Sequence, residues 1–131
     1  MKKSFFDTSI FIYALENNST VAQNLFQRAL NEGTVGTSTI TIMEYATGCL
    51  KHKKIERLNN FRYFLQALMF EVVPIDDVIA LKAAEIRANY PFFKAMDALQ
   101  LATAFVSKAD VFYTNDKQLV QYKEIAVELL E

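Results

Sequence analysis

Short runs of β-forming residues alternate with longer amphipathic segments along the chain. The short runs have the length of buried strands and lie at 5–6, 34–37, 71–74, 111–114 and 125–129. The segments between them place apolar residues at helical spacing, at 8–17, 20–30, 39–50, 55–69, from 77 onward, at 97–107 and at 117–122. Strands that alternate with helices predict an α/β fold, in which a parallel sheet of about five strands has helices on both faces.

Two of these segments carry further signals. Apolar residues recur from Ile55 to Met69, which predicts the longest amphipathic helix of the chain, with both residues on its buried face. Pro74 closes the third strand, and because proline cannot donate to a sheet it favours an edge position or a strand end. We therefore expect the strand at 71–74 either to lie at the border of the sheet or to end at Pro74.

Composition limits the classes of protein that the chain can belong to. Its 131 residues are 52% hydrophobic, which predicts a single domain spanning 1–131 with a full core. The formal net charge of −1 disfavours a non-catalytic protein that binds nucleic-acid phosphates through basic residues. It is compatible with an enzyme that binds phosphates through metal ions. No uninterrupted apolar run approaches the ~20 residues of a membrane span. Cys49 is the only cysteine, so we expect a buried, unpaired thiol and a cytoplasmic protein.

Four acidic residues lie where a strand-like stretch gives way to a helix-like one. They are Asp7, Glu44, Asp97 and Asp116. In an open α/β sheet all strand-to-helix junctions lie along one edge, where ligands bind. Acids that are far apart in sequence would therefore meet in one cluster, which repels itself unless cations hold it together. The pattern predicts a divalent-metal site.

Each of these acids also has a purely structural interpretation. Asp7, Asp97 and Asp116 could cap the helices that follow them. Glu44 completes Thr41-x-x-Glu44, a capping-box pattern that would require no catalysis. Their joint placement favours the metal site, because serine or asparagine would serve equally well as a cap, and a structural protein gains little from negative charge gathered on one face.

The available ligand types favour a hard metal ion. His52 is the only histidine and lies in the basic run Lys51–Lys54, so we expect it on the surface rather than in a zinc site. Ligation by oxygen alone points to Mg²⁺ or Mn²⁺. The sequence contains neither a glycine-rich phosphate loop nor the Gly-x-Ser-x-Gly elbow of esterases.

Four short motifs follow one another along the chain. They are Phe6-Asp7-Thr8-Ser9-Ile10, Ser38-x-Ile40-Thr41-x-x-Glu44, the helix-opening run Met96-Asp97-Ala98-Leu99-Gln100-Leu101-Ala102-Thr103-Ala104, and Thr114-Asn115-Asp116. In this order and spacing the chain resembles the PIN-domain family, and within it the VapC-type ribonuclease toxins of bacterial toxin–antitoxin pairs. The resemblance covers essentially the whole chain.

The resemblance implies a PIN-like fold and a metal-dependent endoribonuclease. It maps the acidic metal site onto Asp7, Glu44, Asp97 and Asp116, with Asp7 and Asp97 as the firmest ligands. It places supporting hydroxyls at Ser9 and Thr114. It also implies an RNA substrate such as tRNA, a cognate antitoxin protein and a homodimer.

Two other features bear on the substrate. The stretch Tyr90–Ala95 lacks the glycine often found there in the family and is unusually aromatic, so substrate preference and antitoxin fit do not follow from the resemblance. The basic residues that could guide an RNA backbone are Lys51, Lys53, Lys54, Arg57 and Lys94.

Three other functions use parts of the same pattern. A receiver-like signalling domain would use Asp76, Thr114 and Lys117 as phosphoacceptor, hydroxyl switch and lysine. Its acid pair should then follow the first strand, whereas Asp76 and Asp77 follow the third and are better interpreted as helix caps. A non-catalytic binding module could retain the PIN fold. A DNA nuclease is the nearest enzymatic alternative, because no residue identifies a reader of the 2′-hydroxyl.

Overall fold

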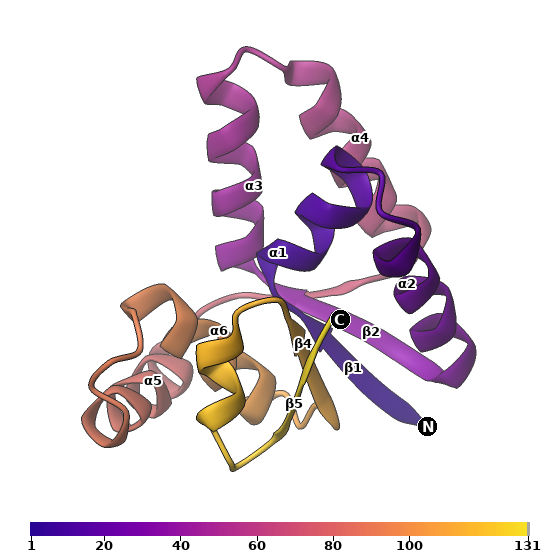
Figure 1. Cartoon of the computed structure of the whole chain (residues 1–131). Coiled ribbons are helices and arrows are strands. Elements are labelled where there is room, and N and C mark those ends of the chain that lie inside the picture. The colour runs from indigo at the N-terminus through magenta and orange to yellow at the C-terminus, as the bar shows by residue number, and fades with distance from the viewer. Residues whose placement is uncertain (131) are drawn as a thin grey trace.

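The computed structural model describes residues 1–130 and contains a five-stranded sheet (Figure 1). The strands are β1 (Lys2–Phe6), β2 (Gly33–Ser38), β3 (Glu71–Val73), β4 (Val111–Thr114) and β5 (Ala126–Leu129). All neighbouring strands pair in parallel, in the order β3-β2-β1-β4-β5. This confirms the predicted sheet and places β3 at an edge, which is one of the two positions that Pro74 favours.

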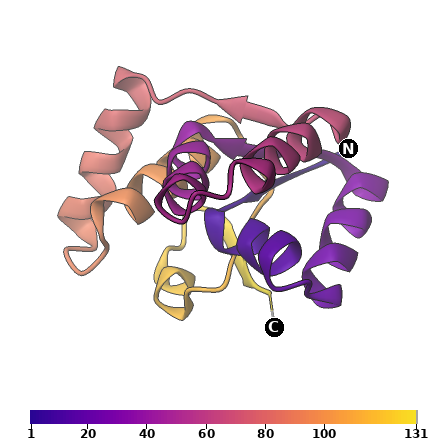
Figure 2. The ribbon, with the colours of Figure 1, turned by 90° about the horizontal axis from the view of Figure 1, so that it is seen from above.

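Helical segments connect the strands and cover both faces of the sheet. They are α1 (Thr8–Phe11), the π-helix η1 (Ile12–Glu16), α2 (Thr20–Glu32), α3 (Thr39–Lys51), α4 (Ile55–Ala67), α5 (Asp77–Asn89), α6 (Ala95–Val106) and the 3₁₀-helix η2 (Lys117–Gln121). In the view from above, α5 and α6 lie on the opposite side of the molecule from α2 (Figure 2). The predicted α/β architecture with helices on both faces is confirmed.

Adjacent residues of the central strands point into two separate hydrophobic cores, as the pleat requires. The rings of Phe6 and Tyr113 stack with their centroids 5.2 Å apart, in the core shared with α1 to α4. Phe5 and Phe112 stack at 5.8 Å in the core shared with α5 and α6. Burying a phenylalanine stabilises a fold by roughly 1.5 to 3 kcal/mol. These rings therefore fix the ends of β1 and β4 firmly from both sides.

The helix predicted at 8–17 divides into two helical types. It is α-helical only to Phe11, and the residues from Ile12 to Glu16 form π-helical turns. Asn17 N donates to Ile12 O at 3.1 Å, across five residues rather than four. The predicted helix is therefore present from Thr8 to Glu16, but its second part is π-helical, which the sequence did not indicate.

The amphipathic helix predicted at 55–69 is shorter than expected. As α4 it ends at Ala67, and its 13 residues equal those of α2, α3 and α5. Ile55 is 54% exposed and Met69 is 86% exposed, so neither lies on the buried face. Met69 adopts a φ of 57° in the turn after α4, which carries its side chain away from the helix face.

The order of the strands creates a switch point beside β1. From β1 the chain builds the sheet first toward β2 and β3 and later, on the other side, through β4 and β5. The carboxyl ends of β1 and β4 therefore flank the position where open α/β sheets bind ligands. Asp7 directly follows β1, and Asp7 N donates to Tyr113 O at 3.1 Å. Asp116 follows β4 by two residues, so both acids lie at this position.

Candidate active site

The four acids predicted from the sequence line one open pocket at the carboxyl edge of the sheet. Its volume is about 310 Å³, and its wall also includes Thr8, Ser9, Ile12 and Gln100. The acids come from four different elements: the end of β1, the helices α3 and α6, and the turn after β4. They are Asp7, Glu44, Asp97 and Asp116. The structure therefore confirms the prediction that these four side chains come together.

Asp7 is the most constrained of the four. It caps α1, accepting from Ser9 N at 3.0 Å, and its two carboxylate oxygens also accept from the Ser9 and Thr114 hydroxyls. Only 8% of the residue is exposed. Burial raises the pKa of Asp7 to about 6, although the hydrogen bonds from Ser9 and Thr114 oppose this shift. The two predicted hydroxyl residues therefore both contact Asp7.

The hydroxyls that hold Asp7 are themselves held by the backbone of the next loop. Ser9 Oγ accepts from Asn115 N at 3.1 Å, and Thr114 Oγ1 accepts from Asp116 N at 3.0 Å. Each hydroxyl can then donate only toward Asp7. The loop after β4 and the start of α1 are in this way joined through one carboxylate.

Asp97 does not act as a helix cap. The helix predicted from Asp97 begins at Ala95, with Lys94 as its N-cap and no side-chain cap bond, so Asp97 lies inside the first turn. Within residues 1–130 no hydrogen bond to its carboxylate is formed. Burial raises the pKa of Asp97, the charges of Asp116 and Glu44 raise it further, and Lys94 opposes them. The structural interpretation of Asp97 is therefore wrong, and its carboxylate is open to the pocket.

Glu44 takes no part in the predicted capping box. Ser38 caps α3, with Ser38 Oγ accepting from Ile40 N at 3.0 Å, so Glu44 lies beyond the first turn. Instead, Thr8 Oγ1 donates to Glu44 Oε1 at 2.5 Å. Thr8, at the start of α1, thus orients the Glu44 side chain on α3.

Asp116 has two roles in the geometry. It caps η2, because Asp116 Oδ1 accepts from Gln118 N at 3.0 Å, and it also lines the acidic pocket. The capping interpretation is confirmed for this residue but does not exclude a ligand role, since a carboxylate has further acceptor sites.

Gln100 is a site residue whose importance did not emerge from the sequence. It is 3% exposed and lies one turn after Asp97 on α6. Gln100 Oε1 accepts from Ser38 Oγ at 2.6 Å, and Gln100 Nε2 donates to Thr41 Oγ1 at 2.9 Å. The available signal was a lone amide in the uncharged and mostly apolar run Ala98–Val106. Because a buried amide needs partners, Gln100 ties α6 to α3.

The donors of the pocket suit a hard divalent cation. They are carboxylate oxygens of the kind that bind Mg²⁺ and Mn²⁺, and the site contains neither histidine nor cysteine. In the described part of the chain, no three acids, histidines or cysteines already enclose a metal position. The carboxylate oxygens fit such an ion chemically, and the acidic side chains would have to rotate in order to surround it.

The predicted basic residues fall into two groups. Lys94 precedes α6, and its charge acts on Asp97. The others are exposed at the end of α3, in the turn between α3 and α4 or at the start of α4; they are Lys51, Lys53, Lys54 and Arg57. Arg57 Nη1 forms an ion pair with Glu16 Oε1 at 2.7 Å. His52 is exposed in the same turn, as predicted.

The aromatic stretch before Asp97 packs within the connection between α5 and α6. Tyr90 and Phe93 stack at 4.9 Å with nearly parallel rings, and Phe93 is 2% exposed. Tyr90 also packs edge-on against Tyr122 at 5.7 Å. Packing of this loop accounts for most of its unusual composition, while Phe92 remains exposed.

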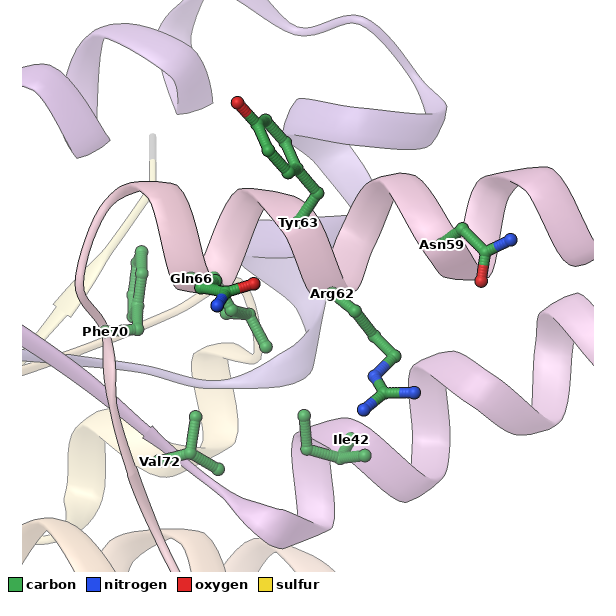
Figure 3. A pocket seen from close by; sticks show the side chains of 8 residues that line it. Ile42, Asn59, Arg62, Tyr63, Gln66, Phe70 and Val72 are labelled. Atoms are coloured by element: carbon green, nitrogen blue, oxygen red, sulfur yellow. The ribbon is translucent and has the colours of Figure 1, made fainter.

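Neither the cavity between α3, α4 and β3 nor the aspartate of the receiver-like alternative lies at the acidic pocket. A cavity of about 520 Å³ lies between α3, α4 and β3, where Arg62 reaches across toward Ile42 (Figure 3), and no acid lines it. Asp76 caps α5, accepting from Ile79 N at 2.9 Å, and does not line the acidic pocket. The cap prediction for Asp76 is confirmed.

None of the helices over residues 1–130 is both long and apolar enough to cross a membrane.

Comparisons with known proteins agree with this geometry. The PIN domain model matches residues 4–125. The structure of VapBC2 from Rickettsia felis bound to a promoter DNA fragment matches with a TM-score of 0.85 at 20% identity, over 97% of this chain and 98% of that chain. A toxin–antitoxin complex from Klebsiella pneumoniae matches with a TM-score of 0.77 at 26% identity, over 98% of each chain.

A third solved structure is also described as that of a toxin. VapC20 from Mycobacterium tuberculosis, described as a sarcin–ricin loop cleaving toxin, matches with a TM-score of 0.70 at 16% identity, over 94% of this chain and 98% of that chain. A search of curated proteins found no match. Since the family model spans nearly the whole sequence and the fold is that of VapC-type proteins, the chain belongs to the PIN-domain family.

Proposed function

We propose that the protein is a metal-dependent endoribonuclease that serves as the toxin of a toxin–antitoxin pair. The observation that carries this proposal is the convergence of Asp7, Glu44, Asp97 and Asp116 on one pocket at the switch point of the sheet. Asp97 is decisive among them, because it caps no helix and its carboxylate faces other acids. A site of this composition is costly for an apo fold and useful for holding a cation.

The proposed ligands divide into two pairs. Asp7 and Asp97 would bind Mg²⁺ or Mn²⁺ directly. Glu44 and Asp116 would complete the ligand set or help to deprotonate the attacking water, and either of them could take either role. When bound, the ion supplies charge neutralisation for the scissile phosphate and acidifies water.

Asp7 is held in one orientation by the chain itself. Ser9 and Thr114 donate to opposite oxygens of its carboxylate, and each of these hydroxyls also accepts a hydrogen bond from a backbone N–H group. These bonds stabilise the ionised form against the cost of burial. A carboxylate oriented before the substrate arrives does not have to reorganise during the reaction.

Glu44 is suited to receive a proton. Thr8 engages Oε1, while Oε2 accepts no hydrogen bond from the described part of the chain. A general base must lie within hydrogen-bond reach of the water that it deprotonates. Glu44 lines the same pocket as the proposed metal ligands, so it would be placed to accept a proton from a water held there.

Lys94 and the amino end of α6 would attract the phosphate. Lys94 precedes the first turn of this 12-residue helix, and Asp97 lies within that turn. The positive end of a helix dipole and a nearby ammonium group both favour an anion. A slightly acidic protein could in this way bind a polyanion close to its acids.

RNA, rather than DNA, is the proposed substrate, and tRNA or another structured RNA is the class to test first. The description of VapC20 as a toxin that cleaves the sarcin–ricin loop supports this choice. The toxin–antitoxin complexes among the structural neighbours support an antitoxin protein as partner. A homodimer and a cytoplasmic location belong to the same proposal.

The test is an incubation of the purified protein, freed of any co-purifying inhibitor, with bulk tRNA, mixed RNA and single-stranded DNA. Each substrate is incubated with Mg²⁺, with Mn²⁺ and with a chelator, beside Asp7→Ala and Asp97→Ala. RNA cleavage that needs a metal and is lost in both variants supports the proposal. Cleavage of DNA alone would make the protein a DNA nuclease. No cleavage by folded protein would favour a non-catalytic binding module.

A further inference from the structure

A second cavity adjoins the acidic pocket. Its volume is about 280 Å³, and Ile12 and Glu44 line both cavities. The helices that surround it are visible in Figure 1, where α3 and α4 form a hairpin and the segment that continues from α1 lies against it. One ligand of sufficient length could therefore occupy both the acidic pocket and this second cavity.

Gly48 keeps the wall of the second cavity open. It lies on α3 one turn after Glu44, which is about 6 Å along the helix axis, and on the same face. A Cβ atom added at Gly48 would meet nothing within 4 Å. The absence of a side chain here leaves a space that begins one helical turn from the acids.

The inner surface of the cavity combines apolar and polar groups. Ile12, Gly48 and the buried Cys49 form an apolar part. Glu16 forms a polar edge, because its carboxylate accepts from Tyr45 OH and from Arg57 Nη1 at 2.7 Å. A flat ring with polar edges fits this combination better than an aliphatic group does.

The outer rim of the cavity is basic. His52, Lys54 and Arg57 line it, and Lys51 and Lys53 lie in the same turn. Across residues 1–130, the lysines of this turn form no ion pair, so their charges are available to a partner. A basic rim beside a ring-sized cavity complements a nucleotide, which joins an anionic phosphate to an aromatic base.

We propose that this cavity receives one unstacked base of single-stranded RNA, adjacent to the phosphate held at the acidic pocket, while the basic turn between α3 and α4 contacts the neighbouring phosphate. The inference rests on the proposed ribonuclease function and adds a subsite to it. Base insertion at one fixed distance from the acids makes cleavage depend on the nucleotide at that position. The cavity thus contributes to the choice of cleavage site.

The test fills the cavity without disturbing the acids. Gly48→Leu places a side chain in the open space, and because leucine favours a helix more than glycine does, the fold should be at least as stable. Thr47→Leu is the matched control, since it adds an apolar group to an exposed position of α3 outside the cavity. Both variants are made in an Asp97→Asn background, so that RNA binding is measured without cleavage.

Binding is read by fluorescence anisotropy of a labelled single-stranded hexanucleotide and of the same strand carrying an abasic position. We expect Gly48→Leu to weaken binding of the intact strand roughly 10- to 100-fold, in keeping with the loss of one stacked base. Thr47→Leu should bind as the background does, and the abasic strand should bind weakly and equally to all three proteins. Equal affinity of the intact strand for Gly48→Leu and the background overturns the subsite.

The cleavage assay of the wild-type protein separates this inference from the proposed function. Cleavage by the wild type together with unchanged RNA binding in Gly48→Leu would remove the subsite and retain the ribonuclease. Base-dependent binding that Gly48→Leu weakens, in a protein that cleaves no RNA, would retain the subsite and remove the ribonuclease.

Discussion

Gln100 Nε2 donates to Thr41 Oγ1 at 2.9 Å, which joins the helix that carries Asp97 to the helix that carries Glu44. Both side chains are buried, so each requires a hydrogen-bond partner inside the protein. The spacing of the two acids therefore depends on a neutral amide that contacts neither of them. Gln100 is in this sense a positioning residue.

Replacing Gln100 with methionine should lower activity more than it lowers stability. The variant preserves the volume but removes the acceptor of the Ser38 hydroxyl proton and one of the donors to Thr41 Oγ1, and a buried group that loses its partner costs about 1 to 3 kcal/mol. Loss of a residue that orients metal ligands typically lowers activity or metal affinity by roughly 10- to 100-fold. We expect a lower kcat and a higher Mg²⁺ requirement at an unchanged KM for RNA.

Gln100→Glu is the companion variant, because it retains the acceptor for Ser38 and loses the donor to Thr41. Its Mg²⁺ requirement should lie between those of the wild type and Gln100→Met. Variants that melt earlier but show the wild-type Mg²⁺ requirement would limit Gln100 to a role in stability.

Asp7→Asn should stabilise the protein at neutral pH. The folded state raises the pKa of Asp7 from 3.8 to about 6, so between these values the folded protein binds more protons than the unfolded chain, and stability falls as the pH rises. Above pH 6 the buried charge costs about 3 kcal/mol, and asparagine removes most of this cost while it retains the cap on α1.

Urea unfolding of the wild type and Asp7→Asn at several pH values measures this effect. The stability of the variant relative to the wild type should rise by about 2 to 3 kcal/mol from pH 3.5 to pH 7.5, on top of a constant offset, because asparagine can accept only one of the two hydroxyl hydrogen bonds that Asp7 accepts. A constant difference across this range would mean that burial does not raise the pKa of Asp7.

Thr114→Val should change the pH dependence of cleavage. The Thr114 hydroxyl donates to Asp7 and lowers its pKa, so its removal moves that pKa further upward from about 6. The ionised form of Asp7 is then lost at a higher pH. The ratio of wild-type to variant cleavage rate should be larger at pH 6 than at pH 8, and an equal ratio at both would contradict the assignment.

Mg²⁺ or Mn²⁺ should stabilise the wild-type protein through the acidic pocket. A ligand at 100 times its Kd stabilises the folded state by about 2.7 kcal/mol, which appears as an increase in Tm. Thermal unfolding with increasing metal should show this increase, and both Asp7→Asn and Asp97→Asn should abolish it. Asp76→Asn is the matched control, since it removes a carboxylate outside the pocket and retains a helix cap.

The sequence predicted the sheet and the meeting of the acids because both follow from local pattern and a general rule. Strand-like runs indicated the strands, and the rule that strand-to-helix junctions share one edge brought Asp7 and Asp116 together. The roles of these acids in metal binding and catalysis stay predictions. The exposed Met69 was missed because periodicity does not reveal the backbone turn that ends α4.

The details that escaped prediction depend on contacts between elements. The capping box at Thr41 was plausible locally, but Ser38 begins α3 three residues earlier and frees Thr41 to bind Gln100. The π-helical turns of η1 bring Glu16 to Tyr45 and Arg57, an arrangement that α-helical periodicity cannot indicate. Contacts with other elements, rather than the helix propensity of the local sequence, determine how Thr41 and Glu16 are used.

The most direct test compares wild-type protein and Asp97→Asn in one preparation, with cleavage of tRNA in Mn²⁺ and the free energy of unfolding measured side by side. We predict that the variant loses at least about 100-fold in cleavage rate while its stability is unchanged or higher, because one of several facing carboxylates has lost its charge. A variant that cleaves as fast as the wild type, or one that is markedly destabilised where the wild type cleaves nothing, would contradict the proposed metal-dependent active site.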